Sequence, residues 1–440
     1  MKILLISYYY PPDRAVGGQR ARKVFESLQA AGHDVVVISA GDSTEGGTLQ
    51  RVVPLPSVRD IYAALRDRYG YSKKDRDSDT ANRPAPAPST DATETPFWKR
   101  WIFSLIWLPD DRQGFIFPAI WRGWHLQSGR PDLIYTTAPP FSVHLAGAIL
   151  RVLTGARWAA EFRDPWTTNP WKPVHMRSAF SDWLERKLEW LCTETADLLV
   201  PVSEGIAGRL AESGTGTPVT VIRNGIEDLR SAEAVKADIR TKGPFEIVYA
   251  GSFYHTRDPF PFLDAVKQLV ADRLLGPEDL RIRFVGATEA YEGRSIGEFV
   301  RGAGLEEHVR LEGWMEPERC LRCIQTADAL LLLALDQPDQ VPNKLYEYLG
   351  ARRPILAVAD EEGEAARMLR QVGGHCVVPV NDARRILPAL EALLDEGRRD
   401  PVGDQHVLES WTTAAQMGGL PGALEACRDP GFDRPAYRSP

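Results

Sequence analysis

The stretch that decides the fold runs from Asp336 to Val358, with the sequence DQPDQVPNKLYEYLGARRPILAV. Its pattern predicts a loop and then a short helix that starts at Pro342 and Asn343. In this prediction Asn343 is the cap of the helix and Gly350 is its stop. The apolar residues that end the stretch indicate a buried strand.

Charged side chains gather at the start of this helix. Lys344 and Glu347 lie three residues apart and share one face, while Leu345 and Leu349 lie four apart and are predicted to face the core. Free amides at a helix N-terminus, with a lysine and a carboxylate beside them, suit an anion with a polyol attached, such as the diphosphate and ribose of a nucleotide. The alternative is a helix whose lysine and glutamate are merely solvated.

Composition excludes several classes of protein. The chain has 440 residues, which predicts about two to three domains. Hydrophobic residues make up 43% and charged residues 26%, as in ordinary globular proteins. The net charge of -7 and the pI near 5.7 argue against nucleic acid as the main partner. We interpret the N-terminal MKILLISYYYPP as a first buried strand and not as a signal peptide.

Cysteine usage indicates a reducing compartment, so the expected location is the cytoplasm. The chain has 5 cysteines and no spacing typical of a disulfide framework. Cys320 and Cys323 form a lone CxxC without a second ligand pair, so we expect plain thiols and no zinc. No apolar run reaches the roughly 18 residues that a membrane span needs.

The nine residues from Pro342 to Gly350 resemble a motif of the retaining glycosyltransferases of family 4, which have the GT-B fold. A common variant in that family is Pro-Ser-Lys-Leu-Phe-Glu-Tyr-Leu-Ala. The resemblance implies that Glu347 holds the ribose hydroxyls of a nucleotide sugar and that amides around Asn343 meet its diphosphate, with Lys344 beside them. The first glutamate of the family motif falls on Asp339, where the shorter carboxylate departs from the family pattern.

Further donor-binding residues follow from the same resemblance. Gly251 and Ser252 come directly after a predicted strand and open a loop in which the family places a basic residue against the diphosphate. Arg257 is the best match for that residue. Trp314 stands where a family residue lies against the nucleobase, and a core tryptophan is the alternative.

The first half of the chain supplies the predicted acceptor side. Gly17 and Gly18 stand before the first helix, where paired glycines allow close approach of a ligand to the backbone. The resemblance implies that they border the transferred sugar and the acceptor, and a tight turn is the alternative. Arg163 and Asp164 follow a predicted strand, and ligand sites lie beyond the carboxyl ends of such strands. We take them as candidate catalytic residues, the alternative being a turn-capping Asp164 paired with Arg163.

The resemblance covers nearly the whole chain and implies an α/β fold of two Rossmann-like domains that face a cleft. The predicted boundaries are 1–225 for an acceptor-side domain with a flexible insertion near 71–96, 226–244 for a linker, 245–400 for a nucleotide-sugar-binding domain, and 401–440 for a tail that packs back on the first domain.

The function that the resemblance implies is transfer of a sugar from a nucleotide-sugar donor to a glycan or lipid-linked acceptor, with retention of configuration. Cell-surface polysaccharide or glycoconjugate biosynthesis is the expected setting, with no metal or other cofactor. Amides at a helix N-terminus, Lys344 and Arg257 would stabilise the charge of the leaving group. The alternatives are a sugar-nucleotide epimerase on the same fold and a non-catalytic relative that only binds nucleotide sugars.

A tryptophan-rich segment lies at Phe97–Leu108, with the sequence FWKRWIFSLIWL. It follows the polar stretch Tyr71–Pro96, whose composition is typical of a surface insertion. Tryptophan and basic residues beside an apolar run predict a peripheral contact with the inner face of the cytoplasmic membrane. A core helix is the alternative.

Overall fold

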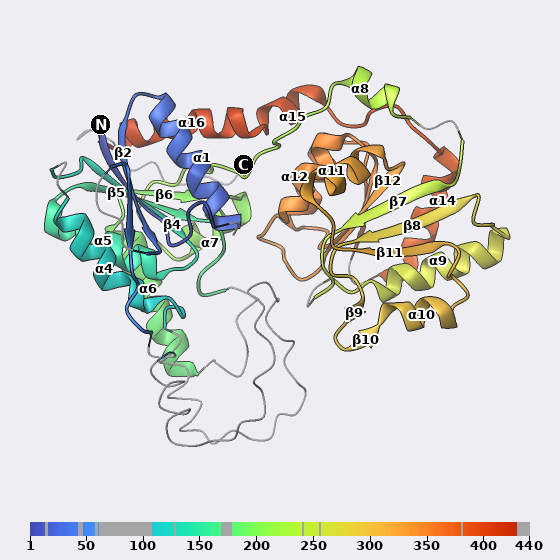
Figure 1. Cartoon of the computed structure of the whole chain (residues 1–440), viewed down its shortest axis with the longest axis horizontal. Helices are drawn as coiled ribbons and strands as arrows, with labels where there is room; N and C mark the ends of the chain where they lie inside the picture. Colours follow the sequence, from blue (N-terminus) through green and yellow to red (C-terminus); the bar gives the residue numbers. More distant parts are fainter. Residues whose placement is uncertain are drawn as a thin grey trace. The chain divides into compact units, whose positions relative to one another are not determined.

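The computed structural model describes residues 1–13, 16–42, 47–57, 60, 108–126, 129–168, 178–239, 242–254, 257–379 and 382–428. The insertion near 71–96 and the segment Phe97–Leu108, except its last residue, lie outside these ranges. The chain divides into two compact units, unit 1 with Met1–Arg223 and Met417–Pro440, and unit 2 with Asn224–Gln416. Figure 1 shows the elements of both units.

Unit 1 is built on a sheet of six parallel strands in the order β3-β2-β1-β4-β5-β6. Its elements in chain order are β1 (Lys2–Ile6), α1 (Val16–Ala30), β2 (Asp34–Ala40), β3 (Leu49–Val52), η1 (Gln113–Phe115), α4 (Ile116–Trp124), β4 (Leu133–Ala138), α5 (Ser142–Thr154), β5 (Arg157–Phe162), α6 (Ala179–Thr195), β6 (Leu198–Pro201), α7 (Glu204–Glu212) and, from Met417 on, α16 (Thr413–Arg428).

Helices cover both faces of this sheet because its strands are apolar on both sides, as expected for parallel strands. Leu4 and Ile6 of β1 pack in one core with α4, α5 and α6, while Ile3 and Leu5 pack in the other core with α1 and α16. Side chains of neighbouring positions on β1 therefore serve opposite layers.

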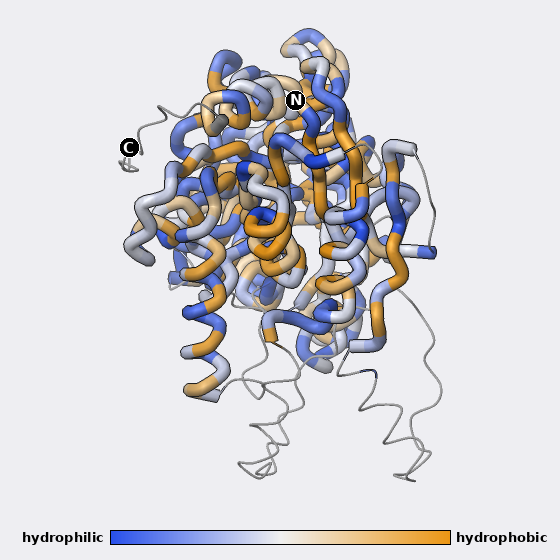
Figure 2. Tube along the Cα trace, turned by 90° about the vertical axis from the view of Figure 1, so that its left-hand side faces the viewer, coloured by the Kyte–Doolittle hydropathy of each residue, from blue (hydrophilic) through white to orange (hydrophobic). Residues whose placement is uncertain are grey.

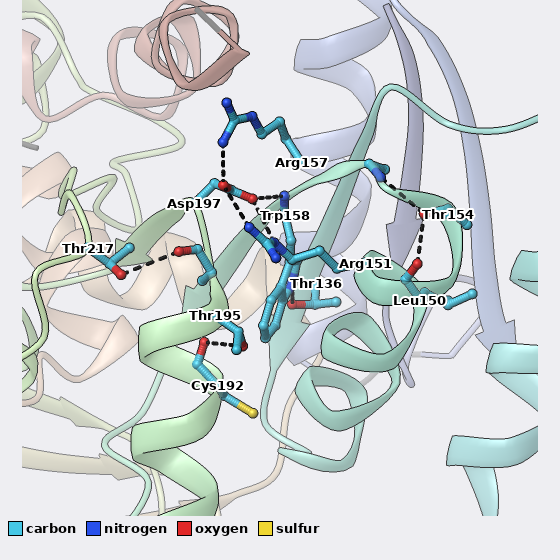
Figure 3. Close-up of polar contacts among 12 residues, drawn as sticks. Thr136, Leu150, Arg151, Thr154, Arg157, Trp158, Cys192, Thr195, Asp197 and Thr217 are labelled. Atoms are coloured by element: carbon cyan, nitrogen blue, oxygen red, sulfur yellow. Dashed lines mark hydrogen bonds and ion pairs between the residues drawn. The ribbon is translucent and has the colours of Figure 1, made fainter. Parts of the chain in front are cut away.

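A partly buried carboxylate, that of Asp197, links α5 to the starts of β5 and β6 (Figure 3). Asp197 accepts hydrogen bonds from Arg151 at the end of α5, from Arg157, and from the backbone amide of Trp158 at 2.9 Å. Burial alone would raise the pKa of Asp197, but its hydrogen bonds from the two guanidinium groups and the amide hold that pKa below its ordinary value.

Unit 2 repeats the same strand order in a second six-stranded parallel sheet, β11-β8-β7-β12-β13-β14, with a separate antiparallel pair of β9 and β10. Its elements are α8 (Ala232–Ala237), β7 (Phe245–Ala250), α9 (Phe260–Arg273), β8 (Leu280–Val285), β9 (Ala290–Tyr291), β10 (Arg294–Ser295), α10 (Ile296–Gly302), β11 (Val309–Gly313), α11 (Pro317–Thr326), β12 (Ala329–Ala334), α12 (Asn343–Ala351), β13 (Ile355–Ala359), α13 (Glu364–Val372), β14 (Cys376–Pro379), η3 (Ala383–Arg385), α14 (Ile386–Glu396) and α15 (Gln405–Ser410).

Two layers of helices also enclose the second sheet. Helices α9, α10 and α14 share one core with the strands, and α11, α12, α13 and α15 share the other. The predicted α/β fold with two Rossmann-like sheets is confirmed, since both sheets have the strand order of a doubly wound domain. Where the sequence suggested a linker at 226–244, the chain forms α8 and counts with unit 2.

The helix predicted from the opening stretch is present as α12, and the strand after it as β13. The predicted stop at Gly350 is wrong, because the helix ends at Arg352, whose φ of 56° is left-handed. Gly350 instead lies inside the helix, where a Cβ would be 2.5 Å from the backbone oxygen of Asp228. Glycine is needed there for close packing and not for termination.

Candidate active site

The predicted donor-binding residues of unit 2 lie at or near the carboxyl ends of its strands. Strands β7 and β12 are neighbours in the sheet, but the strands that follow them in the chain lie on opposite sides: β8 lies beside β7, and β13 lies beside β12. Such a switch point is where open α/β sheets bind ligands, in the crevice beyond the strand ends. Gly251 and Ser252 follow β7 directly, and Asp339 lies in the loop between β12 and α12.

Helix α12 begins at this switch point without a side-chain cap. Pro342 occupies the cap position and makes no side-chain hydrogen bond to the first turn, so the prediction of Asn343 as the cap is wrong. The side-chain oxygen of Asn343 instead accepts a hydrogen bond from the amide nitrogen of Asn224, at 2.9 Å. The start of α12 therefore presents backbone amides and the positive end of the helix dipole.

Lys344 and Glu347 form an ion pair on this first part of α12. The Lys344 Nζ lies 2.6 Å from the Glu347 Oε2, and the two side chains are 34% and 36% exposed. This confirms that they share a face, while Leu345 and Leu349 are buried as predicted. A half-exposed pair of this kind contributes little to stability, so its main effect is to hold a carboxylate and an ammonium group in a fixed orientation at the helix start.

The loop before α12 is anchored by the neighbouring strand. The backbone amide of Gln337 donates to Asp360 after β13, at 3.1 Å, and the amide of Glu364 donates to the carbonyl of Pro338, at 2.8 Å. Asp339 is half-buried between these two anchors. The carboxylate that departs from the family pattern therefore sits on a segment whose backbone is held in place.

The loop after β7 carries a basic side chain in an aromatic setting. The guanidinium of Arg257 lies 4.6 Å from the centre of the Tyr254 ring, and the Arg257 Nε is buried without a hydrogen-bond partner among the described residues. Burial raises the pKa of Tyr249 to about 12 although Arg257 opposes the shift. Tyr249 therefore keeps its proton and donates to the carbonyl of Ser252, at 3.0 Å, which fixes the start of the loop.

Close backbone packing explains the glycine at the start of that loop. A Cβ on Gly251 would lie 3.0 Å from the Tyr249 hydroxyl, and a Cβ on Gly286 after β8 would lie 2.1 Å from the Gly251 oxygen. The backbones of the two loops therefore approach too closely for a side chain at Gly286. This packing fixes the Gly251 backbone at the switch point, between the Tyr249 side chain and Gly286.

Trp314 stands apart from the core. It follows Gly313 at the carboxyl end of β11 and is 71% exposed. The alternative of a core tryptophan is therefore wrong. An exposed aromatic ring at the carboxyl edge of a nucleotide-type sheet has a free face for stacking.

In unit 1 the structure brings Gly17 and Arg163 into contact. A Cβ on Gly17 would lie 2.3 Å from the Arg163 Nη1. The Arg163 guanidinium donates to the carbonyl of Ala138 at 3.2 Å and also to that of Pro139. Arg163 thus joins the loop after β4 to the start of α1, and its neighbour Asp164 is half-exposed. Gly18 is packed similarly, since its Cβ would lie 3.2 Å from the Asp13 oxygen.

A buried ion pair beneath this contact was not predicted from the sequence. Arg20 on α1 and Glu161 on β5 are 4% and 0% exposed and lie 2.8 Å apart. Glu161 also accepts from Tyr135 at 2.8 Å and from Thr137, and Arg20 donates to the carbonyl of Ile222 at 2.7 Å. The one sequence feature that could have indicated this ion pair is a glutamate inside the apolar strand WAAEF. The pair fixes the start of α1, and with it Gly17.

The described residues contain no group of three or more His, Cys, Asp or Glu side chains that would hold a metal ion. Cys320 and Cys323 form no disulfide bond. Every helix in the described ranges is too short or too polar to cross a membrane.

Comparison with known proteins gives this arrangement its class. Residues 17–225 match the family model described as "Glycosyl transferase 4-like domain". Sucrose-phosphate synthase from Thermosynechococcus elongatus has a similar structure, with a TM-score of 0.63 and 15% identity over 96% of this chain and 98% of that chain. No curated protein sequence matches the chain.

Two further solved structures share the architecture. One is an α,α-trehalose-phosphate synthase (UDP-forming) from Burkholderia vietnamiensis, with a TM-score of 0.59 and 12% identity over 99% of both chains. The other is Anabaena HepE in complex with UDP and glucose, with a TM-score of 0.57 and 12% identity over 97% of this chain and 100% of that chain.

The solved structures show that the fold is GT-B, and the family model over residues 17–225 identifies the class of enzyme as a glycosyltransferase. The match of residues 17–225 to the glycosyl transferase 4-like family model confirms the predicted resemblance over that part of the chain.

Proposed function

We propose that the chain transfers a hexose from a UDP-sugar to a glycan or lipid-linked acceptor with retention of configuration. The observation that carries the donor side of the proposal is the start of α12, where a helix N-terminus without a side-chain cap, Lys344 and Glu347 lie at the switch point of unit 2. HepE was crystallised with UDP and with UDP-glucose, which supports UDP as the carrier. We place the reaction in the cytoplasm, within cell-surface polysaccharide or glycoconjugate biosynthesis.

Each donor residue has a proposed task. The carboxylate of Glu347 binds the ribose hydroxyls, and Lys344 and the amides around Asn343 bind the diphosphate. Arg257, with its unfilled Nε, adds a second cation against the diphosphate. Cations and oriented amides stabilise the negative charge that grows on the leaving diphosphate as the glycosidic bond breaks. These groups would act without a metal.

The remaining residues complete the proposed donor and acceptor sides. Trp314 stacks on the nucleobase with its exposed ring, Gly251 and Ser252 border the diphosphate, and Asp339 lies near the sugar. The backbone of Gly17 and Gly18 borders the transferred sugar and the acceptor, and Asp164 belongs to the same acceptor side. Arg163 acts through its contact with Gly17 and the loop after β4.

The test is a thermal-shift panel of UDP-, GDP-, dTDP- and ADP-sugars against the wild type and Glu347→Ala. A ligand at a hundredfold excess over its Kd stabilises the native state by about 2.7 kcal/mol. We expect UDP-sugars to stabilise the wild type and to lose this effect in Glu347→Ala. Glu26→Ala is the matched control, because Glu26 is also a surface glutamate paired with a basic residue of its own helix.

Equal stabilisation of the wild type and Glu347→Ala would contradict the role of Glu347. Turnover of the donor alone, with formation of an epimer and no need for an acceptor, would favour an epimerase over a transferase. Donor binding without any turnover in the presence of a panel of glycan and lipid-linked acceptors would favour a non-catalytic relative.

A further inference from the structure

Three neighbouring helices of unit 1 expose a surface of unusual composition. On α4 the exposed residues are Phe117, Trp121 and Trp124, and on α5 they are Ile149, Val152 and Leu153. Surface positions of a helix normally carry polar side chains. Here both helices are apolar outside as well as inside. We call the exposed side of α4, α5 and α6 the aromatic face; Figure 2 is viewed from the side of Figure 1 on which α4 and α5 lie.

Helix α6 continues this surface and adds positive charge. Apart from Ala179, its exposed residues are four large apolar ones and two basic ones, which are Phe180, Trp183, Arg186, Lys187, Trp190 and Leu191. The acidic side chains of this helix are less exposed: Glu185 is buried, and Asp182, Glu189 and Glu194 are partly buried. Glu189, for example, accepts a hydrogen bond from Thr167 at 2.6 Å. Helices α4 and α5 contain no carboxylate, and the carboxylates of α6 are at most partly exposed, whereas Arg186 and Lys187 are exposed.

The opposite layer of the same sheet serves as an internal comparison. Helix α1 exposes Arg22, Glu26 and Gln29, together with one alanine, which is an ordinary solvated surface. The whole chain has a net charge of -7, so a face whose carboxylates are at most partly exposed is not a product of the overall composition. Contiguous apolar surface of this kind marks a contact site.

Several aromatic rings of the aromatic face stack on one another within this chain. Phe117 stacks on Trp121, with 6.4 Å between ring centres, and Phe180 stacks on Trp183, with 5.8 Å between ring centres. Lys187 lies 5.9 Å from the ring centre of Trp190. Half-exposed tryptophans beside basic residues are typical of proteins at the membrane–water interface.

We propose that the aromatic face is a docking surface for a lipid bilayer that contains anionic lipids. A second copy of the chain fits less well, because a two-fold interface must complement itself. Arg186 and Lys187 would meet the same face of the partner, whose carboxylates are at most partly exposed while its two basic residues are exposed. This proposal is independent of the donor site and goes beyond the proposed contact through Phe97–Leu108.

The test measures binding of the full chain to vesicles of phosphatidylcholine with and without phosphatidylglycerol. In Arg186→Gln/Lys187→Gln we expect binding to the anionic vesicles to fall about 25-fold, or roughly 2 kcal/mol, from the loss of two basic residues at the surface. In Trp121→Ser/Trp183→Ser/Trp190→Ser we expect binding to both kinds of vesicle to be lost. Leu274→Ser is the matched control, an exposed apolar residue of unit 2 outside the donor site whose loss leaves vesicle binding unchanged.

Three results would overturn the proposal. They are absence of vesicle binding by the wild type, vesicle binding by both sets of variants at the level of the wild type, and conversion of a wild-type dimer to monomers by the tryptophan variant in sedimentation. Stabilisation by a UDP-sugar is measured on the same variants. Its persistence shows that the chain is folded and that loss of docking is separate from loss of the donor site.

Discussion

Glu161→Gln tests how the start of α1 is held in unit 1. The glutamate is fully buried. Its carboxylate accepts hydrogen bonds from Arg20 at 3.0 and 2.8 Å, from Tyr135 at 2.8 Å, and from Thr137. Glutamine keeps the size of the side chain and one acceptor oxygen but removes the charge. Arg20, which is 4% exposed, is then left as a buried cation without its counter-ion.

The expected loss follows from that burial. Breaking a buried ion pair by changing one partner costs about 3–5 kcal/mol, because the remaining charge stays desolvated. Whole domains are stable by about 5–15 kcal/mol, so we expect a large fraction of the stability of unit 1 to be lost. Arg20→Met/Glu161→Gln leaves no buried charge and is expected to cost less than the sum of the two single changes.

The assay is urea unfolding followed by tryptophan emission. Of the 12 tryptophans only Trp314 and Trp411 lie between residues 224 and 416, so the emission reports mainly on unit 1. Glu204→Gln is the matched control, since Glu204 pairs with Arg223 at 2.9 Å but is 26% exposed. We expect this control to cost at most about 1 kcal/mol. Equal losses for the variant and the control would refute the reasoning.

Three further outcomes are expected. Gly350→Ala places a Cβ 2.5 Å from the Asp228 backbone oxygen, so the melting temperature of unit 2 should fall by an amount equivalent to about 1–3 kcal/mol; an unchanged melting temperature would contradict this. Trp314→Ala should raise the KM for the donor with little change in melting temperature, because the side chain is 71% exposed; an unchanged KM would argue against stacking. Burial lowers the pKa of His144 to about 3, so unit 1 should lose stability as the pH falls from about 6.5 toward 3, by up to about 1.4 kcal/mol per pH unit from this group, and His144→Leu should flatten the urea-midpoint profile over this range.

The start of α12 was predictable because several independent patterns agree there. The stretch contains an apolar pair four residues apart, a charged pair three residues apart and then an apolar strand. These patterns agree on one arrangement, in which Leu345 and Leu349 are buried and Glu347 is on the outer side of the helix. The stop of the helix was not predictable, because glycine serves both termination and close packing. The contact of Gly350 with the Asp228 backbone depends on the tertiary structure.

The aromatic face and the buried ion pair of Arg20 and Glu161 could not be predicted from the sequence, for a physical reason. Tryptophans at helical spacing are as typical of a core as of an exposed surface, so only the neighbouring sheet decides that Trp121 faces outward. Glu161 is likewise a single charge in a strand, and its partner Arg20 lies on a helix far earlier in the chain. Nothing local connects the two.

Helix α16 was also difficult to predict, because Gly418, Gly419, Pro421 and Gly422 interrupt its pattern. These residues have low helix propensity, and the helix forms because Leu420 and Leu424 are buried in unit 1.

The return of the chain to unit 1 at Met417 has a consequence for synthesis on the ribosome. Domains generally fold in the order in which they emerge, yet the core that contains Ile3, Leu5 and Val24 is completed by Met417 and Leu420 from the last helix. All of unit 2 has been translated before that helix exists. The second half of the protein is therefore expected to fold while the first still exposes an open apolar face, and a stop codon before Met417 would leave that face open permanently.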